Sequence, residues 1–265
     1  MNRIQYSAAA GVALIELNDP PANTYSYEMM QEIDAAVLQA RMDAAVHVIV
    51  ITGAGEKFFC AGANIGMLTE ADPNFKYYFC LHANETMNRL EQTPKLVIAG
   101  LNGHTVGGGL EVAMACDIRI ARQQGGKIGL PEVGLGVLPG TGGTQRLARL
   151  LGKAKAIELM TTGSLLTFEE AHTLGLVTQV WGESDLSGKS FRDALIAYAT
   201  QFTPPHRASK AVGHIKRAVQ SGLETSFAEG LALERELQQR LFESADAREG
   251  LAANLEKRKP QFTGR

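Results

Sequence analysis

Two short and almost wholly apolar runs constrain this fold more than any other feature of the chain. They are VHVIVITG at 46–53 and KLVIAGLNG at 95–103, and each ends in glycine. A strand that is apolar on both faces is typical of a parallel sheet with helices on both sides. Helical patterns separate these runs, and strand and helix patterns alternate up to about residue 185. The alternation predicts an α/β fold.

Other segments fit the same pattern. Further strands are predicted over GVALIEL (11–17), DIRIA (117–121), KIGL (127–130) and LVTQVW (176–181). Ser26 is placed to cap a helix that carries MMQEIDAAVLQARM, because a serine hydroxyl can accept from the free N–H groups of a first turn. Thr167 and Glu170 form a candidate capping box ahead of another helix.

The pattern changes near residue 189. Beyond it the apolar residues recur at helical spacing only, and TPP at 203–205 separates the first two helical segments. A chain of 265 residues is long enough for one large domain with a smaller region beside it. We therefore predict an α/β core over residues 1–190 and a C-terminal helical region over residues 191–265.

The charge balance argues against several classes of partner. Lys and Arg number 26 against 28 Asp and Glu, so we expect no nucleic acid and no membrane partner. No apolar run approaches the ~20 residues of a spanning helix, and the first residues lack the pattern of a secretory leader. Cys60, Cys80 and Cys116 are odd in number and mostly in apolar settings. Reduced thiols and a cytoplasmic location are therefore expected.

Several common chemical motifs are missing from the sequence. There is no G-x-x-x-x-G-K-[ST], G-x-S-x-G, C-x-x-C or H-E-x-x-H. The dense glycines at 134–143 do not complete G-x-G-x-x-G, and the six histidines are scattered. These absences argue against a nucleotide loop, a serine nucleophile elbow and a metal site.

The stretch VGGGLEVAMACD at 106–117 places a carboxylate inside an apolar helix. Its glycines allow a ligand to approach the backbone, and the first N–H groups of the helix have no internal partner. Such donors suit a developing oxyanion. Glu111 lies three residues after Gly108, hence on the same helix face, and its apolar surroundings predict a raised pKa. A glycine cluster that only packs the helix closely, with Glu111 favoured by the helix dipole, is the alternative.

Two more segments have a related design. FFCAGANI at 58–65 follows the first buried strand and can present backbone N–H groups from a turn of small residues. An ordinary turn between a strand and a helix would have the same sequence pattern. Glu132 lies in the apolar, glycine-rich run IGLPEVGLGVLPGTGGTQRL at 128–147. A solvated loop glutamate is the simpler interpretation. Two carboxylates in apolar surroundings, however, can divide the work of base and acid.

Taken in order, these segments resemble the crotonase superfamily, the enoyl-CoA hydratases and isomerases. The resemblance covers nearly the whole chain. It rests on NDPPANTYS (18–26), FCAGANI (59–65), NGHTVGGGLEVAMACDIRIA (102–121), IGLPEVGLGVLPGTGGTQRL (128–147), TGSLLTFEEAHTLGLV (162–177) and EGLAANLEKRKPQF (249–262). It implies a crotonase-like α/β spiral of strand–strand–helix turns. It also implies a C-terminal helical region that trimerises, commonly into a dimer of trimers.

The resemblance further implies an acyl-CoA substrate. Its thioester oxygen would bind in an oxyanion hole formed by the N–H groups of Ala63 and Gly108, and hydratases of the family carry both glutamates, here Glu111 and Glu132. Gly140 matches a position whose N–H helps to place the water.

Contacts with CoA are implied at Ala61, Ile65 and Lys257, the last reaching the CoA of a neighbouring subunit. Tyr25 and His104 are among the positions that depart from the family pattern. Tyr25 stands where leucine is usual, and we expect it in the core. His104 stands where apolar residues are common, and we expect a hydrogen-bonded wall residue. Residues 66–82 are expected to line or cover the acyl pocket.

The function expected from the resemblance is reversible hydration of a 2-enoyl-CoA to a 3-hydroxyacyl-CoA, as in fatty acid β-oxidation. Glu111 would take a proton from water, and Glu132 would protonate C2. No cofactor is expected, since coenzyme A is part of the substrate. The alternatives are an enoyl-CoA isomerase, a hydratase of a branched or cyclic acyl-CoA, and a non-catalytic oligomer that binds CoA or RNA.

Overall fold

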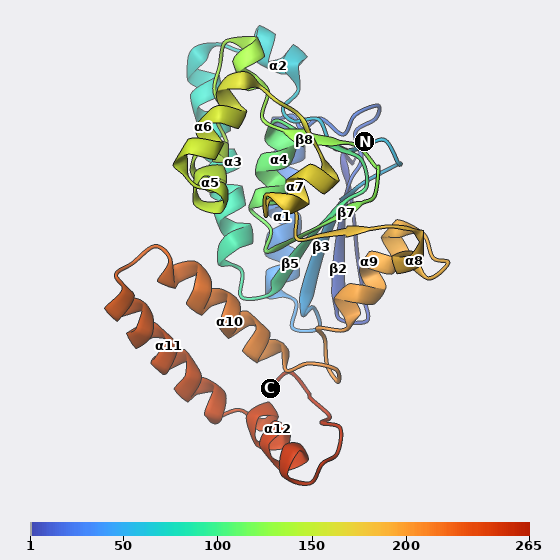
Figure 1. The fold of residues 1–265 in the computed structure, drawn as a ribbon, viewed down its shortest axis with the longest axis vertical. Coiled ribbons are helices and arrows are strands. Elements are labelled where there is room, and N and C mark those ends of the chain that lie inside the picture. Colours follow the sequence, from blue (N-terminus) through green and yellow to red (C-terminus); the bar gives the residue numbers. More distant parts are fainter. Residues whose placement is uncertain (1) are drawn as a thin grey trace.

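A six-stranded sheet forms the centre of the protein (Figure 1). The computed structural model describes residues 2–265. The strand order is β1 (Ile4–Ala9), β2 (Val12–Leu17), β3 (Val48–Gly53), β5 (Leu96–Leu101), β7 (Ile118–Arg122) and β10 (Gln179–Trp181). Only β1 is antiparallel to its neighbour. The two apolar runs form β3 and β5, fully buried in the middle of the sheet, as their composition predicts.

A second sheet of four short strands lies beside the first. Its order is β4 (Phe58–Cys60), β6 (His104–Val106), β8 (Lys127–Gly129) and β9 (Leu166–Thr167). Each of three successive turns of the chain supplies one strand to each sheet and then a helix: β3 and β4, β5 and β6, β7 and β8. The α/β fold and its strand–strand–helix turns are confirmed.

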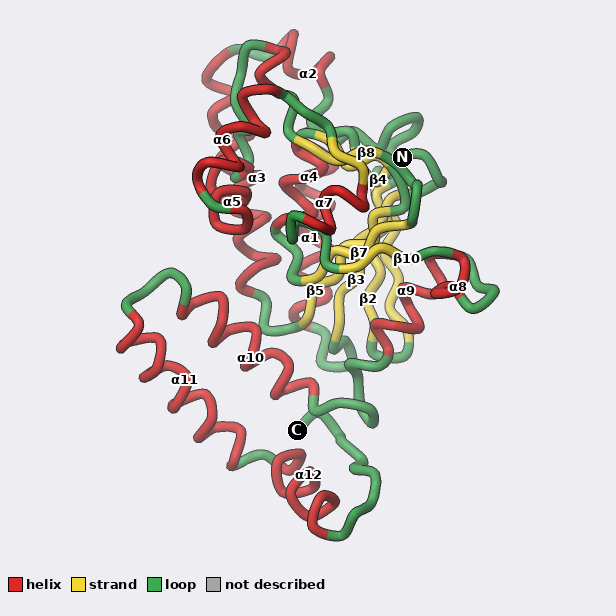
Figure 2. Tube along the Cα trace, viewed as in Figure 1, coloured by secondary structure: helices red, strands yellow, loops and turns green. Residues whose placement is uncertain are grey.

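Helices pack around the two sheets, which Figure 2 shows gathered at the centre of the core. They are α1 (Tyr27–Met42), α2 (Ile65–Glu70), α3 (Pro73–Gln92), α4 (Gly108–Met114), α5 (Gly143–Leu151), α6 (Lys153–Thr162), α7 (Phe168–Thr173) and α8 (Glu183–Leu186). The predicted caps are confirmed, since Ser26 accepts from Met29 N–H and Thr167 forms a capping box with Glu170. A 3₁₀ segment, η1 (Glu132–Leu135), precedes α5.

Helix α9 (Phe191–Thr200) covers the opposite face of the main sheet. Its Phe191 and Leu195 share a core cluster with Val48 and Val50 of β3. A side chain at Gly100 of β5 would overlap Leu195, so glycine at this position lets α9 approach the sheet closely. Although α9 falls within the predicted C-terminal region, its packing partner is the sheet.

The remaining helices form an arm that projects from this body (Figure 1). They are α10 (Ser209–Gly222), α11 (Phe227–Phe242) and α12 (Ala245–Leu255). The first two form an antiparallel hairpin in which Gly222 and Gly230 approach each other. No helix within residues 2–265 is long and apolar enough to cross a membrane. The boundary at residue 190 stays a prediction, and the projecting part of the C-terminal region begins at α10.

Candidate active site

Two glycine-containing turns meet at the start of α4. Gly107 has a φ of +59° and donates its N–H to Gly129 O of β8 at 2.9 Å. Gly62 has a φ of +89°, and a Cβ there would lie 2.9 Å from Gly108 N. Both conformations favour glycine, and the second also requires the space. The turn that carries Ala63 therefore lies against the turn that carries Gly108.

The backbone donors at this junction are free. Within residues 2–265, neither Ala63 N–H nor Gly108 N–H donates to a protein acceptor. Gly108 is the first residue of α4, where an N–H has no partner inside its own helix. These are the two donors that the resemblance implies for an oxyanion hole, and the structure places them on adjacent turns.

Glu111 is the carboxylate of α4 and is only 2% exposed. Its Oε1 accepts from Thr141 N at 2.8 Å and from Gly143 N at 2.7 Å, and its Oε2 accepts from the Thr141 hydroxyl. Burial raises the pKa of Glu111, and these three donors oppose the rise. These donors hold the Glu111 carboxyl in one orientation and favour its charged form.

Glu132 has a different setting at the start of η1. Its carboxyl lies beside Gly107, where a Cβ would be 3.2 Å from Oε1. Its Oε2 is buried and has no hydrogen-bond partner among the described residues. Burial raises the pKa of Glu132 to about 7, its own backbone N–H opposes this, and the charge of Glu111 adds to it. A carboxyl group that is partly protonated at neutral pH can act as an acid.

Thr141 is a site residue that sequence reasoning missed. It follows Gly140 in the loop before α5, and its backbone N–H and its hydroxyl both bind Glu111. Tyr25 was expected in the core and is 1% exposed, but its hydroxyl also lies 3.2 Å from Thr141 Oγ1. The only signal in the sequence is a hydroxyl residue between the glycines of PGTGG, which has many other uses.

The residues implied in CoA binding lie in two places. Ala61 and Ile65 flank the Ala63 turn, and Ile65 is 58% exposed at the start of α2. Ala61 N–H is occupied by Ala22 O at 3.1 Å. Lys257 is exposed just after α12, in the arm, and α12 lies at the opposite end of the molecule from α2 (Figure 1). A single chain therefore does not bring Lys257 to its own Ile65.

Aromatic side chains of α3 pack beside Tyr25. Phe75 and Phe79 stack with ring centres 6.3 Å apart, and Tyr25 lies 5.9 Å from Phe79. These phenylalanines belong to the segment 66–82 that was expected to line or cover an acyl pocket. His104 accepts from Lys127 N at 3.1 Å through Nδ1 and packs against Phe58, so the expected hydrogen bond is present, while a place in the pocket wall stays a prediction.

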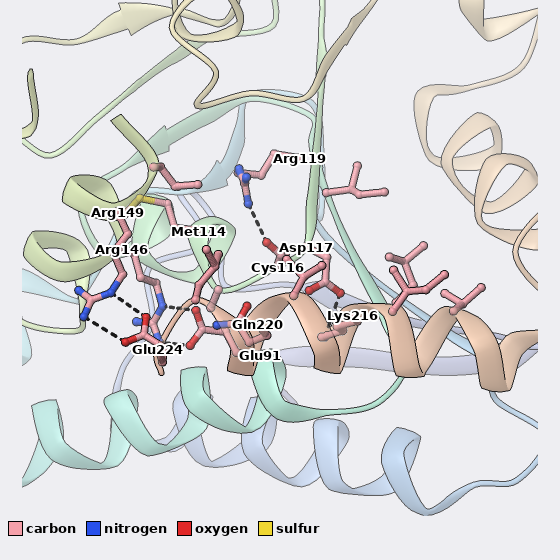
Figure 3. Close-up of a pocket in the computed structure, with 18 of the residues that line it drawn as sticks. Glu91, Met114, Cys116, Asp117, Arg119, Arg146, Arg149, Lys216, Gln220 and Glu224 are labelled. Atoms are coloured by element: carbon pink, nitrogen blue, oxygen red, sulfur yellow. Dashed lines mark hydrogen bonds and ion pairs between the residues drawn. The ribbon is translucent and has the colours of Figure 1, made fainter. Parts of the chain in front are cut away.

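A cavity of about 760 Å³ lies elsewhere, between α10 and the body (Figure 3). Lys216 of α10 reaches Asp117 there at 2.9 Å, and Arg149 pairs with Glu224 at 2.8 Å. Neither glutamate of the site lines this cavity. Within residues 2–265 no group of three or more His, Cys, Asp or Glu side chains is arranged to ligate a metal.

Comparisons with known proteins agree with this fold. A family model described as enoyl-CoA hydratase/isomerase matches residues 7–265. A probable enoyl-CoA hydratase of Bacillus subtilis (strain 168) is 39% identical, with full coverage of both chains. A short-chain-enoyl-CoA hydratase of Clostridium acetobutylicum is 36% identical over 98% of this chain and 97% of its own.

Solved structures show the same similarity. A crystal structure from Geobacillus kaustophilus HTA426 superposes with a TM-score of 0.95 at 43% identity, over 100% of this chain and 98% of the other. An enoyl-CoA hydratase from Bacillus anthracis gives 0.90 at 34% identity, over 99% and 100%. The fold and site define an enzyme of the crotonase type. The chain belongs to the enoyl-CoA hydratase/isomerase family.

Proposed function

We propose that this protein hydrates a 2-enoyl-CoA to the 3-hydroxyacyl-CoA. The observation that carries the proposal is the contrast between two neighbouring carboxyl groups. Glu111 accepts three hydrogen bonds, whereas buried Glu132 Oε2 accepts none from the described residues 2–265, and the pKa of Glu132 is raised to about 7. One group is suited to accept a proton and the other to supply one. The names of the relatives point to the same reaction.

In the proposed mechanism the thioester oxygen accepts from Ala63 N–H and Gly108 N–H. These donors stabilise the negative charge that builds on the oxygen as the double bond is attacked. Glu111 takes a proton from water while the hydroxyl adds to C3, and Glu132 gives its proton to C2. The product gains one H and one OH. Glu111 is left protonated and Glu132 ionised, so a proton must return from Glu111 to Glu132 before the next turnover.

Two further roles belong to this proposal. Gly140 helps to place the attacking water, supported by its position directly before Thr141, which binds Glu111. Ala61 and Ile65 contact the CoA at the exposed start of α2. The reaction needs no metal and no redox cofactor, since protons are the only species exchanged with the protein. Three free thiols suit a cytoplasmic location.

We also propose that the protein acts as a homotrimer or a dimer of trimers. The arm carries large apolar side chains in the open, including Leu223 at 80% and Phe227 at 82% exposure. Apolar patches of this kind mark interfaces between proteins. Neighbouring arms would cover them, and Lys257 would then reach the CoA of the adjacent subunit. Light scattering should give three or six times the 28.5 kDa chain mass, and a monomer would contradict the proposal.

The function is tested by adding crotonyl-CoA to the purified protein and following loss of enoyl-thioester absorbance. Glu132→Gln should lower kcat by about 10²–10⁴, because a positioned catalytic acid contributes roughly that much. Acyl-CoA binding, measured by calorimetry, should be largely retained. Glu183→Gln, an exposed carboxylate on α8, is the matched control and should behave as wild type.

Two outcomes would change the assignment. Glu132→Gln activity within about tenfold of wild type would remove Glu132 from the acid role. A wild-type protein that moves the double bond of a 3-enoyl-CoA without hydrating any 2-enoyl-CoA would be an isomerase. A series of 2-enoyl-CoA substrates that differ in length, branching and rings separates the general hydratase from a specialised one.

A further inference from the structure

We infer that Tyr25 and Thr141 are positioning residues, which hold Glu111 as an oriented carboxylate through a one-directional chain of hydroxyl hydrogen bonds. The inference deepens the proposed function and rests on it, since it concerns the group that accepts the proton from water. The chain runs from Tyr25 Oη through Thr141 Oγ1 to Glu111 Oε2.

The direction of the hydrogen bonds in this hydroxyl chain follows from the number of protons that each group can donate. An ionised carboxylate can only accept, so the single hydroxyl proton of Thr141 is committed to Glu111. Thr141 Oγ1 can then only accept from Tyr25, which lies 3.2 Å away. Burial and the charge of Glu111 raise the pKa of Tyr25 well above its usual range, so this phenol keeps its proton. Each hydroxyl thereby polarises the next.

Tyr25 also connects this chain to the oxyanion turn. Its backbone N–H donates to Gly62 O at 2.9 Å, and its carbonyl accepts from Asn64 N at 2.9 Å. These two bonds bracket Ala63, which forms an isolated bridge with Tyr25. On the other side, the phenol occupies the space that a side chain at Gly108 would need. One residue therefore sets the position of the proposed base relative to both proposed oxyanion donors.

Other ionisable groups face Glu111 and bear on any pH effect. Glu132 lies on η1, Cys60 on β4 and Cys80 on α3. Arg146 of α5 favours the charged form of Glu111, while its guanidinium is paired with Glu91 at 2.7 Å. Glu111 in turn helps to raise the pKa values of Cys80 and Glu132. None of these groups is altered by changes at the two hydroxyls, which isolates the contribution of the chain.

The experiment compares Thr141→Val, Thr141→Ser and Tyr25→Phe through the pH profile of kcat/KM for crotonyl-CoA. Thr141→Val is isosteric and removes one donor to Glu111, so the acidic limb should move up by about one pH unit. The alkaline limb, set by Glu132, should stay in place. Thr141→Ser should restore the acidic limb. Thr144→Val in the same loop is the control, because its hydroxyl does not contact Glu111.

Coupling distinguishes a hydroxyl chain from simple packing. Tyr25→Phe should move the acidic limb in the same direction by less than Thr141→Val, and should have no further effect in a Thr141→Val background. Equal effects of Tyr25→Phe in both backgrounds, or an unmoved acidic limb in Thr141→Val, would overturn the inference.

A second readout does not depend on activity. Infrared difference titration of the Glu111 carboxyl, with Glu111→Gln as the blank, should show the same upward pKa shift in Thr141→Val. A wild-type protein that hydrates no enoyl-CoA refutes the proposed function. The infrared titration then decides separately whether the hydroxyl chain holds Glu111 ionised.

Discussion

The start of α4 and the 3₁₀ segment η1 each carry one glutamate, in opposite surroundings. At α4, two backbone amides and one hydroxyl converge on Glu111. At η1, Glu132 is followed by exposed apolar residues such as Val133 and Leu135, and its buried Oε2 has no partner among residues 2–265. The same chemical group thus meets donors that favour its charged form in one place, and has a pKa raised to about 7 in the other.

This contrast shows how a protein gives two equivalent groups different pKa values through their surroundings. Burial alone raises the pKa of both carboxyls. Three hydrogen-bond donors favour the charged form of Glu111, against a single backbone N–H at Glu132, and the negative charge of Glu111 adds to the rise at Glu132. The donors to Glu111 therefore increase the difference in pKa between Glu111 and Glu132.

The largest expected effect follows from removing the charge at α4. Glu111→Gln should lower kcat for crotonyl-CoA by about 10²–10⁴, since the proposed base can no longer take a proton. The amide oxygen can still accept from Thr141 N–H and Gly143 N–H, so the fold should be retained by circular dichroism. Retained activity with an unchanged pH profile would contradict the division of roles.

A smaller effect is expected from adding a methyl group at the first residue of α4. Gly108→Ala would place a Cβ against Tyr25, and overpacking of this kind costs about 1–3 kcal/mol. Its melting temperature should fall. Gly134→Ala on η1 is the matched control, because nothing lies within 4 Å of its Cβ. Equal melting temperatures for the two variants would show that the Tyr25 side chain can move aside at little energetic cost.

The smallest expected effect is a change in melting temperature caused by ionisation of Glu132 on η1. The folded-state pKa of Glu132 is about 7 against 4.5 for the free group, so the folded protein binds this proton more tightly than the unfolded chain. Ionisation of Glu132 therefore destabilises the fold progressively as the pH rises from about 4.5 to about 7. The full loss of stability is reached above about pH 7. Glu132→Gln cannot ionise and should melt higher than wild type at pH 8.

The difference in melting temperature between Glu132→Gln and wild type should disappear as the pH is lowered. Below the unfolded-state pKa both proteins carry a neutral group at position 132, and their melting temperatures should coincide. Calorimetry over a pH series measures this, with Glu183→Gln as the variant that should track wild type throughout. A constant gap at every pH would mean that Glu132 has the same pKa in the folded and the unfolded state.

Much of the fold was predictable because it depends on local patterns. The runs at 46–53 and 95–103 have no polar face, so they could only become central strands. The caps at Ser26 and Thr167 also follow from neighbouring residues alone. By contrast, α9 shows the helical pattern of the arm that follows it, and only its contacts with β3 place it on the sheet.

The candidate site shows the same limit. Glu111 and Glu132 stand out because charge in an apolar segment is unusual. Thr141 does not stand out, since threonine is common in loops, in strands and at helix caps. Its meaning comes from a contact with a residue 30 positions earlier in the chain. Tyr25 was predicted as a core residue, and the prediction omitted the hydroxyl that reaches Thr141 across 116 positions.

The sequence by itself determined the α/β class, the central strands, the helical C-terminal region and the two candidate carboxyls, because each depends on periodicity or on residue type. Tertiary structure alone decided how the two carboxyls differ. Their pKa values depend on burial and on donors brought from Thr141 and Gly143, distant in sequence. Protonation is set by the distances between groups in space, and these exist only once the chain has folded.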